Sequence, residues 1–261
     1  MNLDLDELIA GWDCPEGEIA ARVVHGYDDA EVLQLRVDMG LLQMSIAGRP
    51  DGERYRGRAT VLEYVRDEID AGRTPADCVW DALTRELTQF NYRRLALTHL
   101  AEDAAHEDRE RDARVWLPAA VRDIDHCILI LKLLAEHREE GAGSNADLAP
   151  TLVFNRARLI ARLYTLDQRY EDAVEELSAG VEALQATLRD LGADDEQCDS
   201  DPGVEYLRQM EARLRRRYGV TRTLHEQLDA AIEAEDFETA ARLRDALRRR
   251  CDGDRSPPTA Y

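Results

Sequence analysis

The sequence lacks several features that would direct it to a particular functional class. Its cysteines are scattered and form no C-x-x-C pair, namely Cys14, Cys78, Cys127, Cys198 and Cys251, so neither a disulfide framework nor a zinc site is predicted. No apolar run approaches the roughly eighteen residues that a membrane-spanning helix needs. The first residues, M-N-L-D-L-D-E-L-I-A-G-W, are acidic and lack the basic region that begins a secretory signal. We therefore expect a cytoplasmic protein.

The motifs of common enzyme classes are also missing. The sequence contains no glycine-rich phosphate-binding loop and no G-x-S-x-G nucleophile motif. Asp123-x-x-His126 has a spacing that occurs in metal sites, but no further ligands cluster nearby, so a pair on a helix surface is the simpler interpretation. We expect a protein without catalytic residues, cofactor or metal.

Lysine is nearly absent, because Lys132 is the single one and every other basic residue is arginine. With 34 basic and 54 acidic residues the formal net charge is −20, which argues against general binding to nucleic acid or anionic membranes. Residues 207–250 differ, with eleven arginines against eight acidic residues. We expect this basic C-terminal part to meet an acidic surface, either of its own chain or of a partner.

Residues 18–52 carry the one β-strand pattern of the sequence. Apolar and polar residues alternate on both sides of Gly40, the apolar ones being Leu33, Leu35, Val37, Met39, Leu42, Met44 and Ile46. A weaker strand precedes them at 19–24, and Arg49-Pro50-Asp51-Gly52 predicts a turn. We expect a small antiparallel sheet of two or three strands, which must pack on helices because so small a sheet is not stable alone.

From residue 58 onward the apolar residues recur at helical spacing. Helices are predicted near 61–72, 74–103, 108–138, 149–166 and 170–190, and Pro118 should kink or divide the third. The loop 141–145 is the best candidate for a boundary. The chain is thus predicted to be mainly α, with a β-meander at 18–52, a helical bundle at 58–190, an acidic linker at 191–203 and an arginine-rich helix with a hairpin at 204–252.

Two features of the bundle resemble a tetratricopeptide repeat. Leu163-Tyr164 and Tyr170-Glu171-Asp172-Ala173-Val174 look like the turn between the paired helices of that family. Phe90-Asn91-x-x-Arg94-Leu95 recurs as Phe154-Asn155-x-x-Arg158-Leu159, each opening an apolar helix, although the spacing exceeds the usual repeat of about 34 residues. We expect two degenerate tetratricopeptide-like helix pairs, with a plain helical bundle as the alternative.

Four arginines of these helices, Arg93, Arg94, Arg156 and Arg158, form a candidate anion-binding groove. If the echoed helices stack in register, their two-pronged guanidinium donors could bind a carboxylate or phosphate. The alternative, which we favour, is that they form salt bridges with the many carboxylates of the chain. The groove carries our second function hypothesis, a small anionic-ligand sensor or an enzyme.

Residues 223–250 predict a two-helix hairpin. Thr223 and Glu226 form an S/T-x-x-E capping box, and Asp236 is placed to cap a second helix. Apolar residues recur at helical spacing on both helices, and Gly253 follows three arginines as a stop signal. The paired alanines Ala240 and Ala241 would let the two backbones approach closely.

The hairpin resembles the UVR motif, which the excision-repair proteins UvrB and UvrC share with some Clp-protease ATPases and their adaptors. The similarity lies in Leu228, Ala231, Glu235-Asp236-Phe237-Glu238, Ala240-Ala241, Leu243-Arg244-Asp245 and Leu247. In that family the hairpin docks on other proteins and is not catalytic. The resemblance therefore implies a bacterial interaction or adaptor protein whose partner is a UVR-containing repair protein or a Clp-type ATPase.

The contact is expected to involve Leu224, Leu228, Ile232, Phe237, Ala240, Ala241, Leu243, Arg244 and Leu247. Two alternatives stay open for the hairpin: a homodimer through Leu228, Ile232 and Leu243, or docking on the acidic body of its own chain. Direct binding of DNA is not expected.

Overall fold

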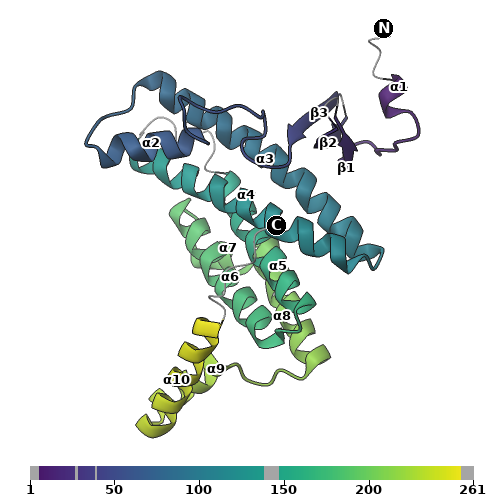
Figure 1. The fold of residues 1–261 in the computed structure, drawn as a ribbon. Helices are drawn as coiled ribbons and strands as arrows, with labels where there is room; N and C mark the ends of the chain where they lie inside the picture. Colours follow the sequence, from purple (N-terminus) through teal and green to yellow (C-terminus); the bar gives the residue numbers. More distant parts are fainter. Residues whose placement is uncertain (1–5, 27–28, 39, 138–146, 254–261) are drawn as a thin grey trace. The chain divides into compact units, whose positions relative to one another are not determined.

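A computed structural model describes residues 6–26, 29–38, 40–137 and 147–253. The chain divides into two compact units, residues 1–163 and 164–261. The described part is mainly helical with a small N-terminal antiparallel sheet, as the sequence predicts (Figure 1). The division falls inside the helix Leu148–Leu166, and the predicted boundary 141–145 lies outside the described residues.

The strands are β1 (Ala20–His25), β2 (Glu31–Val37) and β3 (Gly40–Ser45). The helices are α1 (Asp6–Ile9), α2 (Val61–Asp70), α3 (Asp77–His106), α4 (Glu110–His137), α5 (Leu148–Leu166), α6 (Tyr170–Asp190), α7 (Asp195–Asp199), α8 (Pro202–Tyr218), α9 (Leu224–Glu233) and α10 (Phe237–Gly253). None of the helices in the described ranges is long and apolar enough to cross a membrane.

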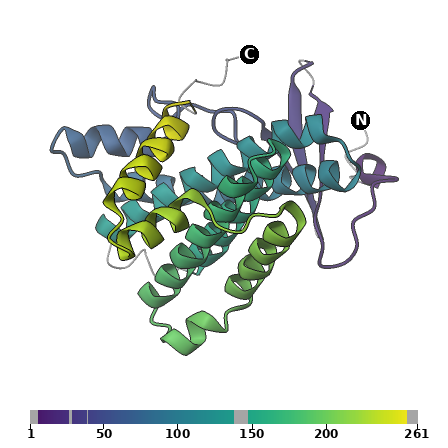
Figure 2. The same cartoon turned by 90° about the horizontal axis from the view of Figure 1, so that it is seen from below.

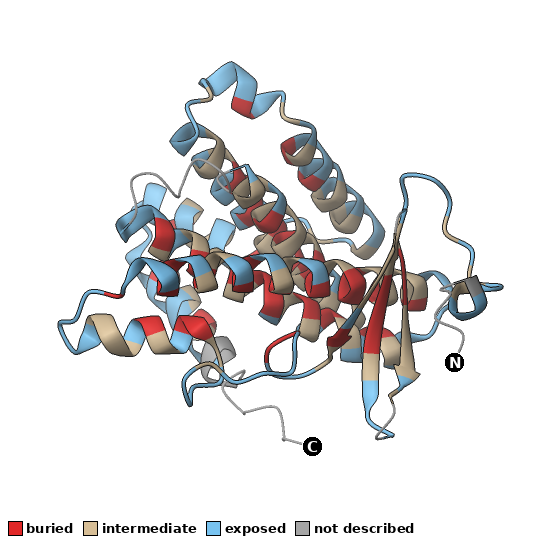
Figure 3. Ribbon diagram, turned by 90° about the horizontal axis from the view of Figure 1, so that it is seen from above, coloured by how far each residue is buried: buried red, intermediate tan, exposed pale blue. Residues whose placement is uncertain are grey.

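The sheet of the first unit has the strand order β1-β2-β3, and both neighbouring pairs are antiparallel. Leu33 and Leu35 on β2 lie opposite Met44 and Leu42 on β3, so the alternating apolar residues share one face. Both leucines are fully buried, and buried residues follow the middle strand (Figure 3). Helix α3 packs on β1 and β2 and supplies the core that so small a sheet needs.

Helices α3 and α4 pack along each other and form the main helical core of the first unit. Of the two outcomes predicted for Pro118, a kink or a division of the third helix, the division is wrong, because α4 continues through this residue. Leu117 and Ala120, on either side of the proline, are buried. Their packing supports the helix across the position where proline removes a backbone hydrogen bond.

In the second unit α6 packs on α8, and α7 contacts both. The segment expected to be an acidic linker holds α7 and the start of α8 instead. Asp194 and Gln197 form a capping box at α7, and Cys198 is fully buried. Asp201 caps α8, which ends at Gly219 in the left-handed conformation with φ of 71°. Because it has a buried side chain and capped helices, this segment is folded and is not an extended linker.

The tetratricopeptide-like pairing stays a prediction. The echoed segments lie within α3 and α5 and do not open these helices. They are nevertheless alike in structure, because each arginine donates to the asparagine three residues before it. Arg94 Nε lies 2.9 Å from Asn91 Oδ1, and Arg158 Nη2 lies 3.0 Å from Asn155 Oδ1.

Candidate functional site

The C-terminal hairpin consists of α9 and α10, which pack on each other across a short connection (Figure 2). At the start of α9, Thr223 Oγ1 accepts from Glu226 N at 3.3 Å and Glu226 Oε2 accepts from Thr223 N at 2.8 Å. The predicted capping box is confirmed. In the connection, Glu235 has a left-handed φ of 56°, and Asp236 Oδ1 accepts from Thr239 N at 3.1 Å. Asp236 therefore caps α10, as predicted.

The start of the hairpin is tied to the rest of the second unit by charged side chains. Arg215 on α8 donates to Glu226 Oε1 at 2.6 Å, and this bond holds the pKa of Glu226 below its usual range. His225 Nδ1 lies 2.9 Å from Glu175 Oε1 on α6. Glu226 thus takes part both in the cap of α9 and in its attachment to α8.

The nine residues predicted to carry the contact fall into two groups. The first group holds the hairpin together: Ala240 and Leu247 are buried, and Leu224, Leu228 and Leu243 are half-buried. The second group is exposed: Ile232, Phe237, Ala241 and Arg244. Of the two alanines expected to bring the backbones together, only Ala240 is buried.

Ile232 and Phe237 lie on either side of the connection, and we call residues 232–237 the hairpin tip. Ile232 is 53% exposed and Phe237 is 71% exposed, the highest exposure of any large apolar side chain in the described residues. Large apolar side chains exposed on a surface lose the stabilisation that burial would give them. The tip therefore holds the exposed large apolar side chains of the hairpin.

The charges of the hairpin are divided between its helices. Exposed arginines on α10 are Arg242, Arg244, Arg248 and Arg249, whereas the charged groups of α9 are acidic apart from the histidine. Arg242 donates to Thr239 Oγ1 and Arg244 to Asp245 Oδ1. Glu238 and Asp245 of α10 are exposed as well, so the four arginines leave α10 with a net basic balance on a chain that is strongly acidic overall.

A comparison with protein-family models identifies this hairpin, because residues 220–249 match the family described as the UvrB/uvrC motif. The hairpin thus matches the UVR motif. The match includes the capping box, the tip and most of α10. It confirms the resemblance inferred from the sequence and covers only the C-terminal end of the chain. No curated protein and no solved structure matches the chain.

The arginines predicted to form an anion groove have acceptors within the first unit. Arg93 is 1% exposed and donates to both oxygens of the buried Asp123, at 2.6 and 2.9 Å. Its remaining nitrogen donates to the carbonyls of Ser45 and Gly48. Arg94 is also buried, and this burial lowers its pKa. Both side chains therefore belong to the core and do not offer a free guanidinium to solvent.

The other two arginines join α5 to its neighbours. Arg156 donates to Asp125 Oδ1 on α4 at 2.7 Å, and Arg158 pairs with Glu102 on α3. Arg93, Arg156 and Arg158 thus form the internal salt bridges that we favoured over an anion groove.

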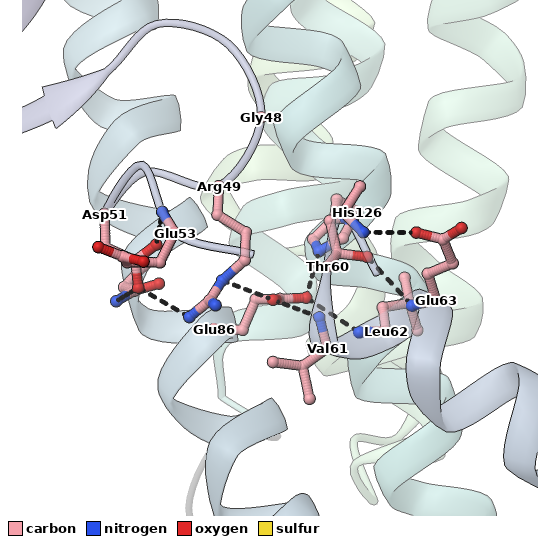
Figure 4. Close-up of polar contacts among 12 residues, drawn as sticks. Gly48, Arg49, Asp51, Glu53, Thr60, Val61, Leu62, Glu63, Glu86 and His126 are labelled. Carbon is pink, nitrogen blue, oxygen red and sulfur yellow. Dashed lines mark hydrogen bonds and ion pairs between the residues drawn. The ribbon is translucent and has the colours of Figure 1, made fainter. Parts of the chain in front are cut away.

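A buried carboxylate on α3 organises the polar interior of the first unit (Figure 4). Glu86 is fully buried and accepts from Val61 N at 2.7 Å and from Leu62 N at 3.1 Å. It also lies 3.2 Å from Arg49 Nε and 3.0 Å from His126 Nε2. Because a helix N-terminus attracts negative charge, Glu86 stabilises the start of α2 while it joins α2, α4 and the loop that carries Arg49.

The sequence pair Asp123 and His126 does not act as a unit. Asp123 binds Arg93, whereas His126 contacts Glu86 and stacks on Phe90 with ring centroids 3.8 Å apart. The interpretation as a surface pair is wrong, because Asp123 is fully buried and His126 is largely buried. Within the described residues, no group of three or more histidine, cysteine or acidic side chains is arranged to hold a metal ion.

Sequence reasoning missed Glu86, although a signal was present. Glu86 falls on the apolar stripe of its helix, next to Leu87 and one turn from Leu83 and Phe90. A carboxylate at such a position needs buried donors. Beside the cluster lies a pocket of about 640 Å³ with walls from α3, α4, α5 and the loop before α2, including Phe90, Val121, His126, Leu129, Ile160 and Leu163.

Proposed function

We propose that this chain is a non-catalytic interaction protein that binds a partner protein through its UVR hairpin. The observation that carries the proposal is the motif match at residues 220–249 together with the exposed apolar tip inside it. UVR motifs occur in proteins that bind other proteins or the repair machinery. The hairpin is attached at its start by Arg215 and His225, so its tip is free of these attachments and available for binding.

The partner surface that fits this hairpin is apolar at its centre and acidic at its edge. Ile232 and Phe237 would enter an apolar hollow of the partner, because burying large exposed side chains supplies most of the binding free energy in small interfaces. The arginines of α10 would meet carboxylates and speed association. We propose a UVR-containing repair protein or a Clp-type ATPase as the partner.

The proposal predicts a specific loss of binding when charge is placed on the tip. In a pull-down from cell lysate, the full chain should recover a partner that the double variant Ile232→Asp/Phe237→Asp does not. Both side chains are exposed, so the substitutions should leave the hairpin folded, and hydrogen exchange of the α9 amides checks this.

The matched control is Val115→Asp/Leu191→Asp, which adds the same charge at two other exposed apolar residues outside the hairpin. This control should recover the same partner as the unchanged chain. If the tip variant and the control recover identical proteins, the hairpin does not carry the interaction and the proposal fails. A homodimer through the hairpin would appear as recovery of the chain itself by a differently tagged copy.

A further inference from the structure

The two edges of the three-stranded sheet differ in how they are protected. On β1, Arg22 donates to the carbonyl of Leu8, and its guanidinium lies 4.0 Å from the centre of the Trp12 ring. Residues 8–12 are therefore held beside β1, and the charged Arg22 lies on this edge strand itself. The other edge, β3, has the sequence G-L-L-Q-M-S, without charge or proline. Uncharged edge strands of this kind accept further strands, and most proteins avoid them.

The backbone of β3 has groups that point away from the sheet. Ser45 N donates to Pro50 O at 2.8 Å, so the amide of Ser45 faces away from β2. Along an antiparallel strand, successive residues point their N–H and C=O groups alternately toward the neighbouring strand and away from it. The N–H and C=O groups of Leu41 and Gln43 therefore also face outward, and no partner for them occurs in the described part of the chain.

A small hollow beside this edge would receive a side chain of an added strand. It has a volume of about 170 Å³ and is lined by Leu42, Gln43, Met44, Pro50, Asp51, Gln89 and Tyr92. Tyr92 on α3 is 39% exposed, and of the three strands α3 packs chiefly on β1 and β2. An apolar side chain next to Leu42 would cover the tyrosine ring and extend the core past β3.

The charges at the two ends of β3 determine what fits there. The exposed Asp38 precedes the strand and accepts from Gly17 N, and Asp51 lies in the hollow near the Ser45 end, 2.7 Å from Arg49. Arg49 is shared between Asp51 and Glu86, so these three side chains together keep an excess of negative charge. A second copy of this chain, paired so that Leu41 faces Gln43, would bring Asp38 of one copy toward Asp51 of the other. Like charges at such positions oppose pairing, whereas basic residues there would favour it.

We propose that the β3 edge binds an extended segment of a partner protein in which basic residues flank an apolar residue. The segment adds a fourth strand through the backbone of Leu41 and Gln43 and places its apolar residue beside Leu42 and Tyr92. Ser45 N already donates to the carbonyl of Pro50 and cannot pair with an added strand. The pairing is therefore short and the complex is weak. This surface lies in the first unit and does not depend on the UVR hairpin.

The test measures fluorescence anisotropy of a short labelled peptide of alternating threonine and valine with lysine at both ends. The full chain should bind this peptide at concentrations up to about 1 mM. Binding should fall about tenfold with glutamates in place of the lysines, and as much when alternate amides of the peptide are N-methylated and cannot donate. Equal binding of all three peptides, or none by the first, overturns the proposal.

Protein variants locate the site. Gln43→Pro removes an outward N–H at an edge position that tolerates proline, and it should abolish binding. Gln43→Thr keeps the N–H and should bind the peptide normally. Ile232→Asp/Phe237→Asp should also bind normally, and a loss there would place the peptide on the hairpin instead. A dimer of the unchanged chain in light scattering that Gln43→Pro makes monomeric would assign the edge to a second copy and overturn the proposal.

Discussion

Replacing Asp123 with alanine should strongly destabilise the unit formed by residues 1–163. Asp123 is fully buried and accepts hydrogen bonds from Nε and Nη2 of Arg93. Without it the buried Arg93 keeps only neutral acceptors, the carbonyls of Ser45 and Gly48. Removing one partner of a buried ion pair lowers the free energy of unfolding by about 3–5 kcal/mol.

Tryptophan fluorescence during urea unfolding is the appropriate assay. Trp12, Trp80 and Trp116 all lie in the first unit, so the signal reports the unfolding of that unit alone. With a urea m-value of about 2 kcal/mol/M, the expected loss moves the unfolding midpoint down by about 1.5–2.5 M. A shift of this size is easily measured.

Two control variants separate the buried pair from nonspecific damage. Arg122→Ala removes an exposed arginine that also contacts Asp123, at 3.3 Å, and should change the midpoint little. Arg93→Met/Asp123→Leu removes both charges and should recover much of the stability lost in Asp123→Ala. An Asp123→Ala midpoint equal to that of the unchanged chain, or a double variant no more stable than the single one, would refute the reasoning.

Three further predictions concern the hairpin and the net charge. Thr223→Ala removes the cap of α9 and should lower its local stability by about 1 kcal/mol, measured by hydrogen exchange of the α9 amides; Thr223→Ser should restore protection. The bond from Arg215 lowers the folded-state pKa of Glu226. The ionised Glu226 therefore stabilises the folded state above the ordinary glutamate pKa range, and this stabilisation is lost as the pH falls through the folded-state pKa. Protection of α9 should therefore decrease on acidification, and Glu226→Gln should remove this part of the pH dependence. Finally, the net charge of −20 predicts that Tm rises between low and moderate NaCl as like charges are screened, and a Tm independent of salt in calorimetry would contradict this.

Features that depend on neighbours in the sequence were predictable. The capping box of Thr223 and Glu226 and the cap at Asp236 are encoded within four residues of each helix start. The alternation around Gly40 likewise predicted the strands, because the period of the side chains decides which face is buried. The UVR motif was recognisable for the same reason, since its signature is local.

Features that depend on distant partners were not predictable from the sequence. Glu86 has an acidic side chain among apolar neighbours, and only the folded structure shows that it accepts from the amides of residues 61 and 62 and pairs with Arg49 and His126. For Arg93 we favoured an internal salt bridge over a binding groove, but the sequence did not identify its partner Asp123, which is thirty residues away. The position of Ile232 and Phe237 at a tip depended on which apolar residues the two helices bury against each other.

The Glu86 cluster also has a consequence for biosynthesis. The loop that carries Arg49 and the first turn of α2 both contact Glu86 on α3. Glu86 is also in contact with His126 on α4. On a nascent chain that emerges from its N-terminus, residues 49–62 must therefore wait without their native contacts until the segment around residue 126 has been synthesised. Residues 49–62 are therefore synthesised well before they can fold, and a chaperone that holds nascent chains would meet them in that interval.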